Sequence, residues 1–229
     1  MLKAVLFDWD GTLADTRQVI VAAFQQAMRE VNVEVEAGFI ERRIGTGGEQ
    51  TIKEILQTSK VPFDEALVKR LAAKKVQAEI KMSDRVKLFP GALELLNALQ
   101  GKAKVALASM NNRPVVDYLL ISMKIRELFT VVVTVEEVSN FKPNPEIFLK
   151  TASKLRCLPA DCVVVEDSIF GVQAAKAAGM SCIAVLTGVY SREELETANP
   201  GLIIDSLTEK EKIFNFIFRK LFFSNPRNQ

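Results

Sequence analysis

The chain of 229 residues contains no histidine. Histidine is the commonest general base in enzymes and the commonest ligand of transition metals. Its absence excludes every catalytic or metal site that depends on an imidazole. The net charge is also small, +2 at pH 7. The composition therefore gives no case for a nucleic-acid partner, which would need a concentrated basic face.

Cysteine is sparse, and an odd set of three does not indicate a disulfide framework. Cys162 and Cys182 lie in apolar runs, which predicts reduced core side chains, and Cys157 and Cys162 are too isolated for a zinc site. No hydrophobic run is long enough to span a bilayer. Met1-Leu2-Lys3 leads straight into an apolar run, without the pattern of a signal peptide. We therefore expect a cytoplasmic protein.

What is present is the composition of a globular protein, with 48% hydrophobic and 25% charged residues. Short, continuously apolar runs predict strands that are covered on both faces, as in a parallel sheet: Ala4–Phe7, Val105–Ala108, Val131–Val135, Cys162–Val165 and Cys182–Leu186. Helical patterns separate most of them, at Ala92–Leu99, Pro145–Leu155 and Gly171–Ala178. This alternation predicts an α/β fold with a doubly wound, Rossmann-like parallel sheet.

Residues 16–85 interrupt the alternation, because they show helical patterns only. These are Arg17–Val31, a stretch near Ile40, Gln50–Thr58 and Asp64–Lys81. The last is rich in good helix formers. Phe89-Pro90-Gly91 then marks the return to the main fold. We expect an α/β core from residues 1–15 and 86–229, with a helical insertion at 16–85.

The strongest chemical signal is Asp8-Trp9-Asp10-Gly11-Thr12-Leu13, which directly follows the first predicted strand. Two carboxylates two residues apart point the same way in strand geometry, and Gly11 permits a sharp turn. Ligands of open α/β sheets bind at this carboxyl end of the strands. The pair can therefore gather a hard cation and approach a phosphate, although aspartates in such a position also serve simply as turn or cap residues.

Three further segments agree with a cation and phosphate site. Ser109 ends the second strand, where its hydroxyl and the nearby amides of Met110 and Asn111 can hold phosphate oxygens. Lys142 lies in a loop that contains Pro143 and Pro145, so its position is restricted. Two acids followed by a predicted helix cap end another strand, at Glu166-Asp167-Ser168. A second pair of acids is what an oxygen-ligated magnesium site requires.

Together, these motifs resemble those of the haloacid dehalogenase-like superfamily, from Asp8 to about Asp205. The stretch Glu166–Met180 resembles the branch of β-phosphoglucomutase, phosphoglycolate phosphatase and related sugar-phosphate phosphatases. Its small residues would let a helix pack close to the sheet: Gly171, Ala174, Ala175 and Ala178. The resemblance implies that 16–85 is a helical cap domain, which closes over the site and favours a small phosphorylated metabolite as substrate.

The resemblance also implies the site chemistry. Asp8 is expected to attack phosphorus and become an aspartyl phosphate, and Asp10 to protonate the leaving oxygen and then activate water. Mg²⁺ is expected at Asp8, Asp10 and Asp167, with Glu166 acting through water. Phosphate oxygens are expected at Ser109, Lys142, Gly11, Thr12, Met110 and Asn111. Asp15 and Thr16 are expected to be structural, with Thr16 capping the first insertion helix.

Three functions stay open, and a phosphatase is favoured. A β-phosphoglucomutase-like mutase shares every core residue, but it uses a cap histidine, and it carries a phosphate-binding arginine where this chain has the glycines of 44–49. Asp10 argues against a dehalogenase, which lacks the second acid. An inactive binding relative would lack a core acid, and none is lost here. Arg42, Arg43 and Lys81 are candidates for substrate contact, although each is also an ordinary surface charge.

The aromatic segment Ile213–Phe223 predicts a final helix packed on the sheet. A dimer contact or an interfacial membrane helix are the alternatives. The sequence allows either a monomer or a homodimer.

Overall fold

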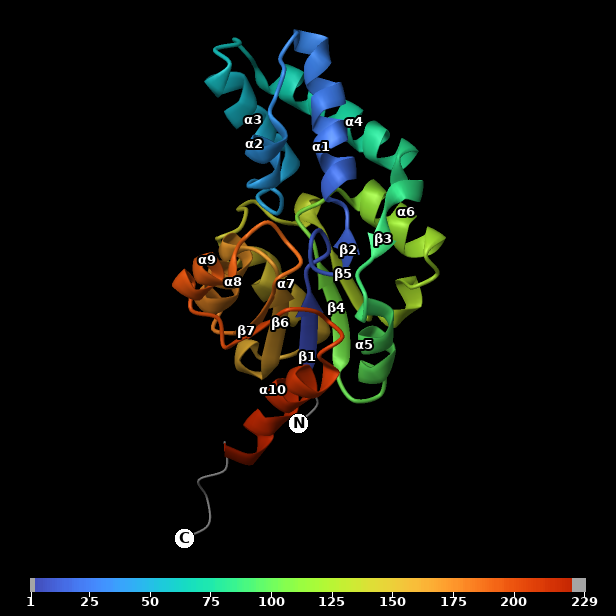
Figure 1. The fold of residues 1–229 in the computed structure, drawn as a ribbon, viewed down its shortest axis with the longest axis vertical. Coiled ribbons are helices and arrows are strands. Elements are labelled where there is room, and N and C mark those ends of the chain that lie inside the picture. The colour runs from blue at the N-terminus through green and yellow to red at the C-terminus, as the bar shows by residue number, and fades with distance from the viewer. Residues whose placement is uncertain (1–2, 224–229) are drawn as a thin grey trace.

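A six-stranded parallel sheet forms the centre of the protein, with strand order β5-β4-β1-β6-β7-β8 (Figure 1). The computed structural model describes residues 3–223, and the side chains of residues 3–218. The strands are β1 (Ala4–Phe7), β4 (Lys104–Ala108), β5 (Val131–Val133), β6 (Cys162–Glu166), β7 (Ser181–Val185) and β8 (Leu202–Ile204). β1 lies in the middle of the sheet, paired with β4 and β6.

Apolar side chains leave both faces of this sheet, as the continuous apolar runs predict. Along β1, Val5 and Phe7 enter one core, while Ala4 and Leu6 enter the other. The first core is covered by α5 (Ala92–Leu99), α6 (Arg113–Ser122) and α10 (Lys210–Phe223). The second is covered by α7 (Glu146–Leu155), α8 (Ile169–Ala177) and α9 (Arg192–Thr197). The predicted doubly wound α/β fold is confirmed.

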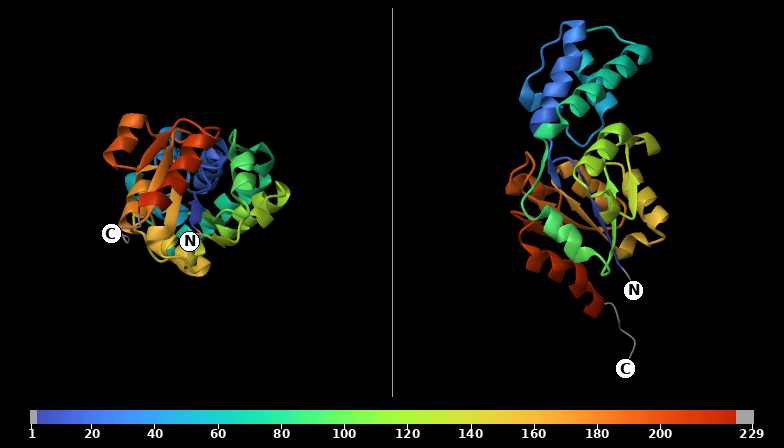
Figure 2. Two further views of the ribbon diagram at one scale, coloured as in Figure 1. Left: turned by 90° about the horizontal axis from the view of Figure 1, so that it is seen from below. Right: turned by 90° about the vertical axis from the view of Figure 1, so that its right-hand side faces the viewer.

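The remaining helices gather beyond the carboxyl ends of the strands, above the sheet in Figure 1 and in the right-hand view of Figure 2. They are α1 (Arg17–Met28), α2 (Ala37–Glu41), α3 (Gly48–Thr58) and α4 (Glu65–Lys81). They bury a hydrophobic core of their own, which includes Phe24, Ile52 and Leu71. We call these four helices the helical unit.

Two chain segments join the helical unit to the sheet, and they pair with each other. β2 (Ala14–Asp15) and β3 (Lys87–Leu88) form a two-stranded antiparallel ribbon. The 3₁₀ turns complete the secondary structure: η1 (Arg29–Val31), η2 (Ser83–Arg85), η3 (Arg126–Leu128), η4 (Val135–Glu137) and η5 (Pro159–Asp161). Both chain connections between the sheet and the helical unit pass through this ribbon. The ribbon therefore helps to hold the helical unit over the carboxyl ends of the strands.

Two local predictions need correction, and one strand was missed. The strand expected to reach Val135 ends at Val133, because the chain turns into η4 after Thr134. Thr16 occupies the N-cap position of α1, but its side chain makes no cap hydrogen bond. The edge strand β8 was not predicted, because a run of three residues beside Gly201 is too short to stand out.

The aromatic C-terminal segment forms α10, as predicted, and Ile213 and Ile217 are buried against the sheet. Phe214 and Phe218 pack against each other at the edge of the same core, with ring centroids 5.5 Å apart. The side chains after residue 218 lie outside the described part of the chain, so the dimer and membrane alternatives stay untested. Within residues 3–223, no helix combines the length and apolar character that crossing a membrane requires.

Candidate active site

Asp8 and Asp10 leave the carboxyl end of β1, the central strand of the sheet. The amide of Asp8 still donates to Val165 O at 3.0 Å, so Asp8 continues the pairing of β1 with β6. The chain then turns at Gly11, which has a φ of +85°. A Cβ at Gly11 would lie 2.4 Å from Asp167 Oδ2, so this close approach of two loops requires glycine.

Lys142 joins two carboxylates in the buried centre of the site. Its Nζ atom donates to Asp8 Oδ1 at 2.6 Å and to Glu166 Oε1 at 2.7 Å. Only 3% of Lys142 is exposed, and its ammonium lies 5.0 Å from the centroid of the Phe148 ring. The peptide bond between Lys142 and Pro143 is cis. The structure therefore holds this lysine in place, as the prolines of its loop predict.

Glu166 uses its other oxygen to organise the turn that begins α8. Oε2 accepts hydrogen bonds from Asp167 N at 2.9 Å, Ser168 N at 2.8 Å and Ser168 Oγ at 2.9 Å. Ser168 also caps α8, as predicted, by accepting from Gly171 N at 3.0 Å. A Cβ at Gly171 would lie 1.8 Å from Glu166 Cδ. The glycine in the first turn of α8 thus gives this carboxylate its space.

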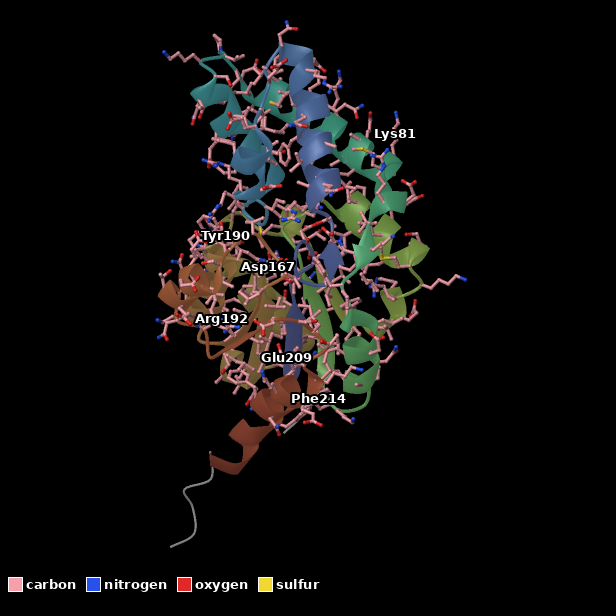
Figure 3. The ribbon with its side chains drawn as sticks, viewed as in Figure 1. Lys81, Asp167, Tyr190, Arg192, Glu209 and Phe214 are labelled. Carbon is pink, nitrogen blue, oxygen red and sulfur yellow. The ribbon has the colours of Figure 1, made fainter. Side chains whose placement is uncertain are left out.

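Asp167 faces the first loop from the end of β6. Its Oδ1 accepts from Thr12 Oγ1 at 2.8 Å. A Cβ at Gly188 would lie 2.1 Å from its Oδ2, so a second glycine loop closes over the same carboxylate. Figure 3 shows Asp167 at the level where the sheet meets the helical unit.

The loop after β4 completes the group on the side of Asp10. Ser109 Oγ lies 3.4 Å from Asp10 Oδ2, and Asn111 Nδ2 donates to Asp10 Oδ1 at 3.3 Å. Asn111 N donates to Ser109 Oγ at 3.0 Å, which fixes the turn, and Met110 is buried beside it. The structure therefore brings the predicted residues of four loops together.

Crowding of buried acids perturbs their protonation. Burial raises the pKa of Asp8 to about 8, against the opposing effect of Lys142 and with the help of Glu166 and Asp10. Burial also raises the pKa of Asp167 well above its ordinary value, with Glu166 and Asp8 adding to it. Burial raises the pKa of Asp10, and the nearby Thr16, Lys75 and Asn111 groups offset only part of that effect.

Lys142 responds in the opposite way. Burial alone would lower the pKa of its ammonium, but the Asp8 and Glu166 carboxylates outweigh burial and hold that pKa above its ordinary value. Lys142 is therefore a fixed positive charge at the centre of the acids.

The donor chemistry of the site fits a hard divalent cation. Asp8, Asp10 and Asp167 are buried carboxylates whose pKa values are raised mainly by burial, so a cation beside them would stabilise their charged forms. Carboxylate oxygens are ligands that Mg²⁺ favours. Among residues 3–223, no group of three or more His, Cys, Asp or Glu side chains is already arranged to hold a metal ion. The residues present fit the ion by their chemistry, and one of them, Glu166, has both oxygens engaged by other partners.

A pocket lies between Asp10 and the helical unit, and it contains a residue that the sequence reasoning missed. Lys75 of α4 lines this pocket together with Asp10, Asn111 and Arg43. Lys75 is 4% exposed, and its Nζ donates to Asn111 Oδ1 at 3.1 Å. The surrounding sequence is rich in Lys, Ala, Gln and Glu, which predicts a helix but does not show which lysine points inward. Its i, i+4 spacing from the buried Leu71 was the available signal.

The three cations named as candidates for substrate contact lie in different places. Arg43 lines the pocket, although its Nε pairs with Glu54 Oε2 at 2.6 Å. Arg42 instead joins the helical unit to the core: it pairs with Glu194 at 2.6 Å and lies over the Tyr190 ring, 5.1 Å from its centroid. Tyr190, labelled in Figure 3, donates its hydroxyl to Arg42 O at 2.9 Å. Lys81 is exposed at the end of α4.

Comparison with known proteins agrees with this arrangement. Residues 5–185 match the family model of haloacid dehalogenase-like hydrolases. The chain is 31% identical to the phosphoglycolate phosphatase of Salmonella typhimurium, with 91% of this chain and 90% of that protein covered. The crystal structure of CbbY from Rhodobacter sphaeroides in complex with phosphate superposes with a TM-score of 0.81, at 28% identity, over 91% of this chain and 96% of that chain.

A third relative is much longer than this chain. The Arabidopsis thaliana protein SUPPRESSOR OF QUENCHING 1, chloroplastic, is 36% identical over 90% of this chain. The aligned part is only 20% of that protein, so the chain spans about a fifth of its length.

Proposed function

The chain belongs to the haloacid dehalogenase-like hydrolase family, and from that membership we propose that it is a magnesium-dependent phosphatase that cleaves a small phosphomonoester through an aspartyl phosphate on Asp8. The observation that carries this proposal is the convergence of four loops on Asp8, where Lys142 Nζ lies 2.6 Å from Asp8 Oδ1 and 2.7 Å from Glu166 Oε1. Relatives that are named phosphatases support the same reaction class.

In this proposal, the Asp8 carboxylate, the Asp10 backbone carbonyl and the Asp167 carboxylate would hold Mg²⁺. Glu166 takes part only through water, because its oxygens already accept from Lys142 and from the turn of α8. The bound ion supplies positive charge that reduces repulsion between the phosphate and the acids.

Asp8 is the nucleophile. Lys142 occupies Oδ1 of Asp8, so we assign the attack on phosphorus to Oδ2. The new bond joins Oδ2 to phosphorus, and the bond between phosphorus and the leaving oxygen breaks. Lys142 neutralises the Asp8 carboxylate before the attack and holds a phosphate oxygen, together with Ser109 and the amide of Met110. The amides of Gly11, Thr12 and Asn111 already donate within their own loops.

Asp10 moves the protons. In the first step it donates a proton to the leaving oxygen, so an alcohol departs. In the second step it takes a proton from water, whose oxygen attacks phosphorus and releases inorganic phosphate and the free Asp8 carboxylate. The raised pKa of Asp10 suits a group that must carry a proton at neutral pH. Ser109 and Asn111 orient its carboxylate.

We assign residues 16–85 to a cap domain and the rest of the chain to the catalytic core. The pocket between Asp10 and the helical unit supports this assignment, because residues of both line it. A site that both parts of the chain border in this way suits a small substrate, and closure of the cap over it would limit the access of water.

The test is hydrolysis of para-nitrophenyl phosphate with and without Mg²⁺. We expect turnover that needs Mg²⁺, and we expect Asp8→Asn to lower kcat by about 10³-fold or more, because the amide cannot form the intermediate. Asp15→Asn is the matched control, since Asp15 is an exposed carboxylate of the same segment. Turnover by Asp8→Asn equal to that of the unmodified protein would refute the nucleophile.

A further inference from the structure

Helix α4 buries a pair of opposite charges at the border between the helical unit and the core. Lys75 Nζ and Glu79 Oε2 lie 2.9 Å apart, and the side chains are 4% and 1% exposed. They occupy the face of α4 that also buries Leu71. Charged side chains are almost never fully buried without a partner, and burying even a paired charge is costly. Such a pair therefore calls for an explanation beyond helix stability.

Lys75 points from this pair toward the reaction centre. Its Nζ donates to Asn111 Oδ1 at 3.1 Å, and Asn111 Nδ2 in turn donates to Asp10 Oδ1 at 3.3 Å. The ammonium lies 5.3 Å from the centroid of the Phe24 ring. Lys75 lines the pocket beside Asp10, so it is placed to donate to the part of a substrate that leaves with the alcohol.

Glu79 stands one helical turn beyond Lys75 on α4. It is not among the residues that line the pocket. Neither of its carboxylate oxygens meets the geometry of a hydrogen bond with any described residue, although both are buried. Its ion-pair partner is the Lys75 ammonium, and the Asn111 side chain also interacts with its carboxylate. Glu79 thus acts on the pocket through Lys75, by holding it and by offsetting its charge.

Each positively charged side chain that lines the pocket is paired with a carboxylate. Arg43 lines the pocket, but Glu54 lies 2.6 Å from its guanidinium. Asp10, which also lines the pocket, adds no positive charge. Of the described side chains that line this pocket, none offers an uncompensated positive charge. A second anion on the substrate would enter a region without excess positive charge, whereas a hydroxyl would find a hydrogen-bond donor in Lys75.

We propose that Glu79 is a positioning residue that neutralises Lys75 and so makes the pocket select phosphomonoesters with a neutral, hydroxyl-bearing leaving group over those with a second anion. This inference rests on the proposed phosphatase function and adds the class of substrate to it. The substrate hydroxyl accepts a hydrogen bond from Lys75. Glu79 offsets the positive charge of Lys75, which would otherwise attract a substrate carboxylate.

A matched pair of substrates tests the inference. Glycerol 3-phosphate and 3-phosphoglycerate share their carbon skeleton, but a hydroxymethyl group in the first is a carboxylate in the second. We expect the unmodified protein to favour glycerol 3-phosphate in kcat/KM by about tenfold or more. Glu79→Gln keeps the shape and removes the charge, so it should shift the ratio of the two kcat/KM values about tenfold toward 3-phosphoglycerate. The ratio does not depend on the fraction of folded protein.

Glu65→Gln is the control, because it removes the same charge from the exposed first turn of the same helix. It should leave the ratio unchanged. If Glu79→Gln lowers both kcat/KM values equally, Glu79 has a merely structural role and the inference is wrong. A preference of the unmodified protein for 3-phosphoglycerate would overturn it as well. Absence of turnover on both substrates and on para-nitrophenyl phosphate would instead refute the proposed function, and the inference with it.

Discussion

Lys142 is the residue on which the electrostatics of the site depend most. It is the positive charge between the buried Asp8 and Glu166 carboxylates. Lys142→Met removes the charge but keeps most of the side-chain volume, so it leaves two acids buried without compensation. We expect it to lower the free energy of unfolding by about 3–5 kcal/mol, measured by urea denaturation in the absence of metal.

A partly exposed lysine provides the comparison. Lys53 pairs with Glu65 at 2.8 Å on the surface of the helical unit. Lys53→Met should change the free energy of unfolding by less than about 1 kcal/mol, because exposed pairs contribute little. Equal effects of the two substitutions would mean that Lys142 does not stabilise the acids as described.

The residues around Asp8 were predictable from the sequence for a physical reason. Each of Asp8, Ser109 and Asp167 follows an apolar strand, and parallel strands bring their carboxyl ends to one edge. Lys75 and Glu79 were not predictable in this way, because they sit in a helix and their residue types are good helix formers. Only the tertiary structure reveals that this face of α4 meets Asn111.

At the scale of elements, the start of α8 ties the fold to the site. Gly171 lies where a Cβ would be 1.8 Å from Glu166 Cδ and Oε1. Gly171→Ala therefore forces the Glu166 carboxylate away from Lys142 and from the turn that it organises. We expect a loss of about 1–3 kcal/mol in the free energy of unfolding, and a lower kcat on para-nitrophenyl phosphate.

Gly38 in α2 offers the matched substitution, because nothing lies within 4 Å of a Cβ built there. Gly38→Ala should raise the free energy of unfolding by about 0.5–1 kcal/mol, since alanine is the better helix former and loses less backbone entropy on folding. The prediction for Gly171 fails if both alanine variants are more stable than the unmodified protein.

Elements were predictable to different degrees. Five strands of the sheet were predicted, because short, continuously apolar runs indicate strands once helical patterns separate them. β8 at the edge has only three residues and no alternation that distinguishes it from a loop. Thr16 holds the predicted N-cap position of α1, but its buried side chain makes no cap hydrogen bond, and the pattern of a polar residue before a helix cannot show that.

At the scale of the whole molecule, the buried acids make stability depend on pH. Asp8 has a pKa of about 8 in the folded protein, above its ordinary value of 3.8, and the pKa values of Asp10 and Asp167 are also raised. Between about pH 4 and pH 8, the folded state therefore binds more protons than the unfolded state. Stability from this source is complete below about pH 4 and is lost as the pH rises through about 8.

Metal-free protein should therefore melt at a lower temperature at about pH 8.5 than at about pH 6. Each kcal/mol corresponds to about 2–4 °C for a chain of this size, so we expect a fall of several degrees. The chain has no histidine to titrate within this range.

Mg²⁺ competes with protons for the same carboxylates, so the rise in melting temperature on adding Mg²⁺ should be larger at the higher pH. Asp8→Asn removes one of these acids, and it should reduce both the fall with pH and the effect of Mg²⁺. If the metal-free protein becomes more stable from pH 6 to pH 8.5, the pKa values of these acids are not raised in the folded state. If the Mg²⁺ effect on the melting temperature shrinks as the pH rises, the ion does not bind to these carboxylates.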